Sequence, residues 1–212
     1  KAIKVLINNG YSFAENIPYE LPYRHYPRLK KKDRIAAVEI HRDVIIRKYS
    51  KIFNYDFLQK DFQFINKFSV LSFANKLNLS IITNQINDYA FYYKTISLRN
   101  AYDVFLLSKK SDAKKAINKL VDLTKILNFF LAACYEVFDK VDSLSYKNTK
   151  KTVLYLSIFK SQLENNLKTN IRHRIIKSYL MLNYRLSIIY RSVFSKEYRS
   201  YLFKKIIYKI RR

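Results

Sequence analysis

The stretch from Ser111 to Val141 constrains the fold of this chain more than any other. Apolar or small residues recur in it every seven positions, at Ala113, Leu120, Leu127, Cys134 and Val141. A second series lies three residues later, at Ala116, Leu123, Phe130 and Val137. Such spacing predicts an amphipathic helix whose apolar stripe packs against other helices. We therefore predict an all-α fold, built as a helical bundle around this stretch.

The chain is also poor in the residues that β-rich folds use at their turns. Its 212 residues include one Gly and three Pro, whereas tight turns depend on Gly, Asn and Pro. Hydrophobic residues make up 49% of the sequence, enough to build a substantial core. We expect about six to seven helices. Cys134, the one cysteine, falls on the apolar stripe, so we expect a buried thiol and no intramolecular disulfide.

The charge of the chain indicates the class of its partner. The net charge is +25, from 41 basic and 16 acidic residues. So much self-repulsion gains a soluble protein nothing unless a polyanion neutralises it. Nucleic acid is therefore the first candidate partner, and an anionic membrane surface is the second. No apolar run reaches the length that spans a bilayer, since the longest, from Ile126 to Phe138, is interrupted by Asn128 and Glu136.

Residues 1–32 are predicted to form an extended N-terminal arm. All three prolines lie here, and proline removes a hydrogen-bond donor and disfavours helix in the residue before it. Aromatic and cationic side chains alternate from Tyr19 to Lys32 without a hydrophobic period. Tyrosines can stack on unpaired bases while cations contact phosphates; the alternative is an arm packed on the protein's own surface. The candidate RNA-binding residues of the arm are Tyr23, Arg24, Tyr26, Arg28, Lys30, Lys31 and Lys32.

Residues 33–168 are predicted to form the helical bundle itself. Apolar spacing places helices over residues 33–53, 56–76, 88–107 and 144–168, in addition to the central one. Residues 77–83 are expected to be a connection. The phenylalanines of residues 56–76 are expected to belong to the core, as aromatic residues at helical spacing usually do.

Residues 169–212 are predicted to form a basic amphipathic C-terminal segment. An apolar helical stripe runs from Ile171 to Val193, and a break near Ser195 precedes a second amphipathic piece. From residue 168 onward, 13 Lys and Arg residues stand against one acidic residue, Glu197. The candidate RNA-binding residues of this segment are Arg172, Arg174, Lys177, Arg185, Arg191, Lys204, Lys205, Arg211 and Arg212.

The sequence offers little support for catalysis or for a bound metal. Three histidines and one cysteine lack the spacing of zinc ligands, and a single Gly leaves no glycine-rich phosphate loop. No serine stands in a nucleophile-elbow context. We therefore expect no metal, no cofactor and no enzymatic activity.

Two fragments resemble known helical families. Leu98-Arg99-Asn100 resembles the Arg-Asn start of the HEPN ribonuclease motif, which implies RNA cleavage with a His a few residues further on. The residues that follow here, Ala101 to Phe105, include no His. The hairpin pattern of residues 116–167 resembles the small basic four-helix proteins that accompany diversity-generating retroelements or are encoded in rRNA intervening sequences.

Together these features predict a non-catalytic structural RNA-binding protein. We expect a component of a ribosome, including mitochondrial and other organellar ribosomes, or of another large ribonucleoprotein. The expected partner is rRNA, and phosphate contacts are expected to supply most of the affinity. One alternative is a helical scaffold or accessory subunit of another assembly, such as a polymerase or retroelement partner or an organellar complex. The other is a peripheral binder of anionic membranes. The mitochondrial matrix and the cytoplasm both remain open as compartments.

Overall fold

The computed structural model describes residues 1–14 and 25–210, and the described chain is mostly helical. Helices account for 63% of the residues and strands for 7%, with ten helices among the described residues. The prediction of an all-α fold is confirmed. The chain divides into two compact units, which we describe separately. The central unit is Ile45–Lys177, and the terminal unit combines Lys1–Val44 with Ser178–Arg212.

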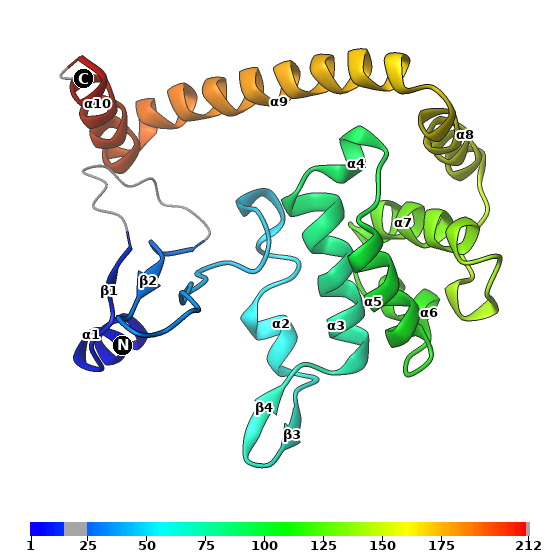
Figure 1. The fold of residues 1–212 in the computed structure, drawn as a ribbon, viewed down its shortest axis with the longest axis horizontal. Helices are drawn as coiled ribbons and strands as arrows, with labels where there is room; N and C mark the ends of the chain where they lie inside the picture. The colour runs from blue at the N-terminus through cyan, green and yellow to red at the C-terminus, as the bar shows by residue number, and fades with distance from the viewer. Residues whose placement is uncertain (15–24, 211–212) are drawn as a thin grey trace. The chain divides into compact units, whose positions relative to one another are not determined.

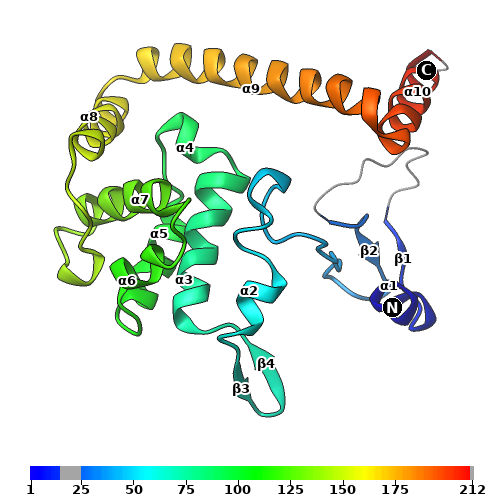
Figure 2. The same cartoon turned by 180° about the vertical axis from the view of Figure 1, so that it is seen from behind.

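The central unit is a set of short helices with one β-hairpin (Figure 1). Its helices are α2 (Tyr55–Gln59), α3 (Phe73–Ile82), α4 (Ala90–Tyr93), α5 (Leu98–Ser108), α6 (Ala113–Asn118), α7 (Thr124–Val137) and α8 (Lys150–Glu164), followed by the first turns of α9 (Asn166–Phe194). The hairpin pairs β3 (Gln63–Ile65) with β4 (Phe68–Val70). Helix α3 contacts α5, α6 and α7, and it lies alongside α5 in both views (Figure 1, Figure 2).

The stretch from Ser111 to Val141 supplies the core of the central unit, as its spacing predicts. Leu120, Leu123, Leu127 and Phe130 are all buried, and the stripe reaches the surface only at its end, at Val137. The stretch forms two helices rather than one, because the chain turns between α6 and α7. The Thr124 hydroxyl donates to the carbonyl oxygens of Ile117 and Leu120, at 3.2 and 2.9 Å, near the end of α6. Carbonyl oxygens near a helix end are thereby satisfied.

Helix α6 begins at Ala113, the first residue of the apolar pattern. Asp112 is its N-cap, and the Asp112 carboxylate accepts a hydrogen bond from the backbone N–H of Lys115 at 2.8 Å. A capping aspartate satisfies a free backbone N–H group and places negative charge at the positive end of the helix dipole.

Helices α7 and α8 share an apolar cluster. It contains Phe129, Ala132, Ala133, Tyr155, Leu156 and Phe159. A buried amide fixes the chain that joins the two helices: Asn128 accepts from the backbone N–H of Lys147 at 2.7 Å and donates to its carbonyl oxygen at 2.9 Å. This pair of hydrogen bonds holds residue 147 against α7.

The helices predicted over residues 33–53 and 56–76 are wrong. Residues 33–53 contain one short 3-10 turn, Arg47–Tyr49, and extended chain. Residues 56–76 divide into α2, the β3–β4 hairpin and the start of α3. The hairpin turn places Asn66 and Lys67 at φ values of +48° and +69°, which the tight turns of hairpins require. Phe64 and Phe68 are exposed on the hairpin, contrary to the core position expected for them.

The segment 77–83 and the helix over 88–107 also need correction. Residues 77–82 continue α3 and include the buried Leu77, Ile81 and Ile82, so they are not a connection. The predicted helix 88–107 is interrupted between α4 and α5. The residues that bound α4, Tyr89 and Lys94, both adopt the left-handed conformation.

In the terminal unit, residues 1–44 are only partly extended. Helix α1 (Ala2–Asn8) precedes β1 (Ser12–Phe13), which pairs antiparallel with β2 (Leu29–Lys30). Further bridges join Leu29 to Val38 and His25 to His41. The described part of the predicted arm therefore folds back on residues 38–41 as a small ladder, with Leu29 fully buried in it.

The C-terminal residues form the second part of α9 and helix α10 (Lys196–Ile210), with the break at Ser195 where the sequence predicts it. Neither Gly nor Pro occurs in the 29 residues of α9, so nothing in its composition interrupts the helix. Ile188 of α9 packs with Tyr198 and Tyr201 of α10 in a small apolar cluster. No helix of the described chain combines the length and apolar character needed to cross a membrane.

Candidate nucleic-acid interface

Helices α9 and α10 together carry eleven Lys and Arg residues against one acidic residue. Helix α9 contains six Lys and Arg residues and no acidic residue. Helix α10 adds five Lys and Arg residues with one acid, Glu197. No carboxylate in α9 neutralises its cations, and phosphate groups of a polyanion are their natural counter-charge.

Four of the predicted residues are exposed and unpaired. Arg174, Lys177, Arg185 and Lys204 lie at the surface, and the structure gives them no ion pair or hydrogen bond to another described residue. At 100° per residue, the three on α9 fall within about 80° of one another around the helix axis. These four side chains, which we call the free cations, are available to contact phosphates.

Two other predicted residues have partners inside the α9–α10 pair. The Arg191 guanidinium donates to the Tyr198 hydroxyl at 3.0 Å, and the Lys205 ammonium donates to the Tyr201 hydroxyl at 3.0 Å. Both cations also lie over the ring of the same tyrosine, 5.7 and 5.2 Å from its centroid. The Arg191–Tyr198 contact joins α9 to α10, whereas the Lys205–Tyr201 contact lies within α10.

Arg172 differs from the other cations of α9 because it is partly buried. Burial lowers the pKa of its guanidinium, and the nearby Tyr155 hydroxyl group acts in the opposite direction. Its neighbour His173 lies against Tyr93, with ring centroids 5.0 Å apart, and within 2.9 Å of the Gln162 side-chain oxygen. Arg172 therefore belongs to the interior edge of the central unit rather than to the open face of α9.

Some of the predicted cations of the N-terminal segment have a partner in the structure and others have none. Arg28 forms an ion pair with Glu39 at 2.7 Å, and the hydrogen bond from Arg28 is the main reason that the pKa of Glu39 is lowered. Lys31 lies over the ring of Tyr11, 5.8 Å from the centroid. Lys30 and Lys32 are exposed and have no partner among the described residues.

Tyr26, a predicted stacking residue, already has a cation on its ring. The Arg42 guanidinium lies 4.0 Å from the ring centroid, a geometry typical of a cation–π contact. The sequence analysis missed this contact and the Arg28–Glu39 pair because both depend on strand-like pairing of residues 25–29 with 38–41. Tyr23, Arg24, Arg211 and Arg212 lie outside the described residues.

Exposed tyrosines of α9 are stacking candidates that the sequence analysis did not single out. Tyr179 and Tyr190 are 55% and 67% exposed, on the helix that carries most of the free cations. At 100° per residue, Tyr179 and Tyr190 lie about 120° and 140° from Arg185 around the helix axis, so unpaired bases and phosphates would contact different faces of α9. The sequence feature that could have identified these stacking candidates is the recurrence of tyrosine within a basic helix.

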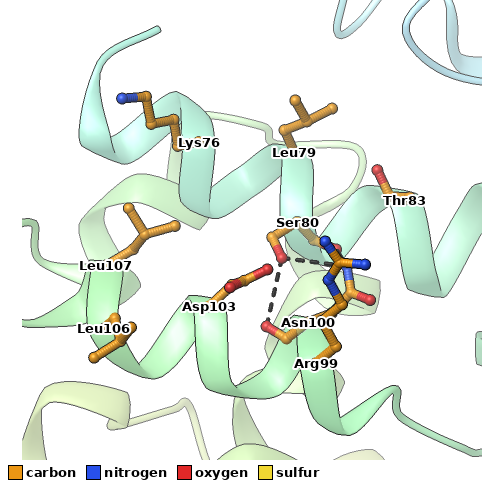
Figure 3. Close-up of a pocket in the computed structure, with 9 residues that line it drawn as sticks. All are labelled: Lys76, Leu79, Ser80, Thr83, Arg99, Asn100, Asp103, Leu106 and Leu107. Carbon is orange, nitrogen blue, oxygen red and sulfur yellow. Dashed lines mark hydrogen bonds between the residues drawn. The ribbon is translucent and has the colours of Figure 1, made fainter. Parts of the chain in front are cut away.

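A separate depression of about 600 Å³ lies on the surface between α3 and α5 (Figure 3). The Asn100 amide donates to the Ser80 carbonyl oxygen at 2.9 Å and fixes one wall. The Arg99 and Asp103 side chains lie on the same side of α5, and neither has a hydrogen-bonding or charged partner in the described chain. Arg99 and Asn100 are the residues that resemble the start of the HEPN motif. Asp103 is among the residues that follow them, and none of Ala101 to Phe105 is the His that the motif requires.

The chemistry of this depression suits weak binding of a polar group. Its walls offer an amide, an arginine and a carboxylate beside leucines, with no histidine to move a proton. Nowhere in residues 1–14 and 25–210 do three or more His, Cys, Asp or Glu side chains gather closely enough to hold a metal ion.

Comparison with known proteins gives no relative from which residues can be transferred. No protein-family model, no curated protein and no solved structure matches the chain. The function must therefore be argued from the residues themselves.

Proposed function

We propose that this protein is a non-catalytic RNA-binding component of a large ribonucleoprotein. The supporting observation is the set of free cations on α9 and α10, which are exposed and lack an acidic partner in the described chain. Phosphate contacts of this kind supply sequence-independent affinity and release counterions. Helical presentation of the cations within each unit, Arg174 and Lys177 in the central unit and Arg185 and Lys204 in the terminal unit, favours recognition of a structured polyanion.

RNA suits helix α9 better than duplex DNA because the helix exposes tyrosine rings as well as cations. Tyr179 and Tyr190 offer exposed rings, and unpaired bases in RNA loops and bulges stack on such rings. Duplex DNA presents its bases already stacked and gives these tyrosines no equivalent contact. The particle we propose is a ribosome, a mitochondrial one included, or another large RNA-protein assembly, in which other proteins would also contact the chain.

The test is binding of the purified full chain to three probes over a range of salt concentrations. The probes are a structured RNA with loops, a duplex DNA of equal phosphate number and vesicles containing anionic lipid. The proposal predicts a steep decrease of RNA affinity with salt and tighter binding to RNA than to DNA. Equal affinity for the two nucleic acids would contradict RNA recognition. Weak binding to all three probes would contradict the proposal and favour a protein partner.

A second candidate, a peripheral binder of anionic membranes, is favoured by the exposed apolar side chains of α10. Phe203, Ile206 and Ile210 recur at helical spacing and are all exposed, with Lys204 beside them. An amphipathic helix with this composition can lie in the lipid headgroup region. Binding to anionic vesicles that is lost in Phe203→Ser and unaffected by competing RNA would favour this candidate over the first.

A further inference from the structure

A group of cations without a counter-charge lies at the inner edge of the central unit. It is built around Lys94, which ends α4 in the left-handed conformation at φ +57°. A non-glycine residue adopts that conformation at a cost in free energy, and such positions concentrate at functional sites.

Lys94 is partly buried against aromatic rings. Its ammonium lies 4.0 Å from the ring centroid of Phe91 and 5.3 Å from that of Tyr155, and it donates to the Phe91 carbonyl oxygen at 3.0 Å. Burial, followed by the positive charges of Arg172 and Lys125, lowers the pKa of Lys94 to about 8. The charged groups that act on Lys94 are thus themselves cations.

A chain of hydrogen bonds brings the start of α9 to Lys94. Gln162 of α8 donates to the Lys94 carbonyl oxygen at 3.0 Å, and its own oxygen lies 2.9 Å from His173 Nε2. Arg172 directly precedes His173. The Arg172 guanidinium is partly buried, yet it makes no hydrogen bond or ion pair with any described residue. A partly buried guanidinium with five donors and no acceptor is costly unless an anion completes it.

The hydroxyl of Tyr155 adds an unpartnered donor to the same group. Tyr155 is 2% exposed, its ring stacks on Phe129 at 4.9 Å, and its hydroxyl has no hydrogen-bond partner in the described chain. Leaving a buried hydroxyl unpaired costs about 1–3 kcal/mol. The Lys94 ammonium lies 5.3 Å from the Tyr155 ring centroid, and the positive charge of Arg172 acts on both groups.

We propose that Lys94, Arg172 and the Tyr155 hydroxyl form a binding site for a phosphate group. A phosphate oxygen accepts hydrogen bonds from ammonium, guanidinium and hydroxyl donors alike, and its negative charge offsets the repulsion between the two cations. Lys125, exposed on α7, adds a further positive charge that acts on Lys94. The hydroxyl is sealed in this structure, so binding requires the Lys94 side chain to turn from the Phe91 carbonyl oxygen toward the anion.

The site is separate from the free cations of the proposed function. Its phosphate can come from a free phosphate or nucleotide, or from the backbone of a bound RNA, and these sources share one chemistry. Its donors belong to α4, α8 and α9 and are buried or partly buried, whereas the free cations are exposed. The two proposals therefore succeed or fail in different measurements.

The first experiment measures thermal unfolding of the full chain with inorganic phosphate against chloride at equal ionic strength. Phosphate in large excess over its Kd should raise the Tm by roughly 5 °C. Arg172→Gln and Tyr155→Phe should each reduce this rise at least by half. Arg47→Gln is the matched control, since it removes an exposed arginine of the central unit that belongs to neither proposed phosphate-binding surface, and it should keep the full rise. Phosphate also raises the Tm of proteins non-specifically, because it is excluded from their surface. This effect is common to all variants, so the difference between their Tm rises reports the site alone.

The second experiment uses the wild-type chain, so it does not depend on whether a variant folds. A lysine of low pKa reacts readily with an amine-directed acylating reagent near neutral pH. Inorganic phosphate should slow acylation of Lys94, read by mass spectrometry, several-fold more than acylation of the exposed Lys114. Protection by uridine monophosphate and by an RNA lacking terminal phosphates, compared side by side, identifies the source of the phosphate.

The proposal is overturned if phosphate raises the Tm of Arg172→Gln and Tyr155→Phe as much as that of the wild type. It is equally overturned if phosphate leaves the Lys94 acylation rate unchanged. Either result can coexist with salt-dependent RNA binding by the free cations, so failure of this site is distinguishable from failure of the proposed function.

Discussion

Leu120 and Val121 show how sharply the central stripe separates core from surface at the level of single residues. They are neighbours in the sequence, yet Leu120 is 1% exposed and Val121 is 82% exposed. A heptad pattern assigns the first to the core and the second to solvent, and the structure agrees. The pattern holds even though the chain turns at this point, because the turn keeps Leu120 and Leu123 directed inward.

Replacement of Leu120 by aspartate should therefore be severe. A carboxylate at this position would be buried without a partner, so we expect Leu120→Asp to lower the free energy of unfolding by more than about 3 kcal/mol or to abolish folding. Val121→Asp is the matched control and should change it by less than about 0.5 kcal/mol. Urea denaturation followed by circular dichroism measures both. Similar midpoints for the two variants would show that the stripe is not the core.

Lys94 should make stability depend on pH in an alkaline window. Its pKa is lowered to about 8 from an ordinary value of 10.5, so between these values the unfolded chain holds a proton that the folded chain has released. The free energy of unfolding contributed by this group therefore rises with pH across the window.

Comparison with Lys94→Met isolates this effect. Between about pH 7 and about pH 9.5, the wild type should gain on the order of 1 kcal/mol of stability relative to the variant, after allowance for solvent screening. Denaturation in phosphate-free buffers measures the difference, and ionisation of the tyrosines is common to both proteins. Parallel pH profiles would mean that the ammonium is not destabilised in the folded state.

At the scale of elements, helices were predictable where the apolar residues kept a single helical spacing. The stripe of residues 111–141 predicted one helix where the structure has two, α6 and α7, and the stripe of residues 171–193 predicted α9, with the break at Ser195 as expected. Residues 33–53 and 56–76 were misread because their apolar residues fit a helical stripe while the chain pairs as strands and bridges. Strand pairing depends on partners distant in the sequence, so local spacing does not reveal it.

The β3–β4 turn offers a direct test at this scale. Lys67 lies at φ +69°, where a side chain is strained and glycine is not. Lys67→Gly should therefore raise the free energy of unfolding by roughly 0.5 kcal/mol. Lys60→Gly is the control, because Lys60 has φ −62° at the end of α2 and glycine there should lower stability by a similar amount. Urea midpoints of the two variants should move in opposite directions.

At the scale of the whole molecule, the sequence predicted where positive charge gathers but not which cations remain free. Arg174, Lys177, Arg185 and Lys204 are exposed and unpaired, as an RNA-binding surface requires. Arg28 and Arg191, predicted with equal weight, are bound to Glu39 and Tyr198. Those partners come from tertiary contacts, which composition and charge counts do not contain. The role proposed for Lys94 could not be predicted from the sequence for the same reason, because its neighbours are set by the fold.

The salt dependence of RNA binding by the free cations tests the central claim most directly. The variant replaces all four with glutamine, and its control replaces Lys110, Lys114, Lys150 and Lys151, which are equally exposed and unpaired in the described chain. Both variants lose the same net charge. Loss of four phosphate contacts should reduce the slope of log K against log salt concentration by about 3, with little change in the control. Equal slopes for the two variants would contradict the assignment of the RNA surface to α9 and α10.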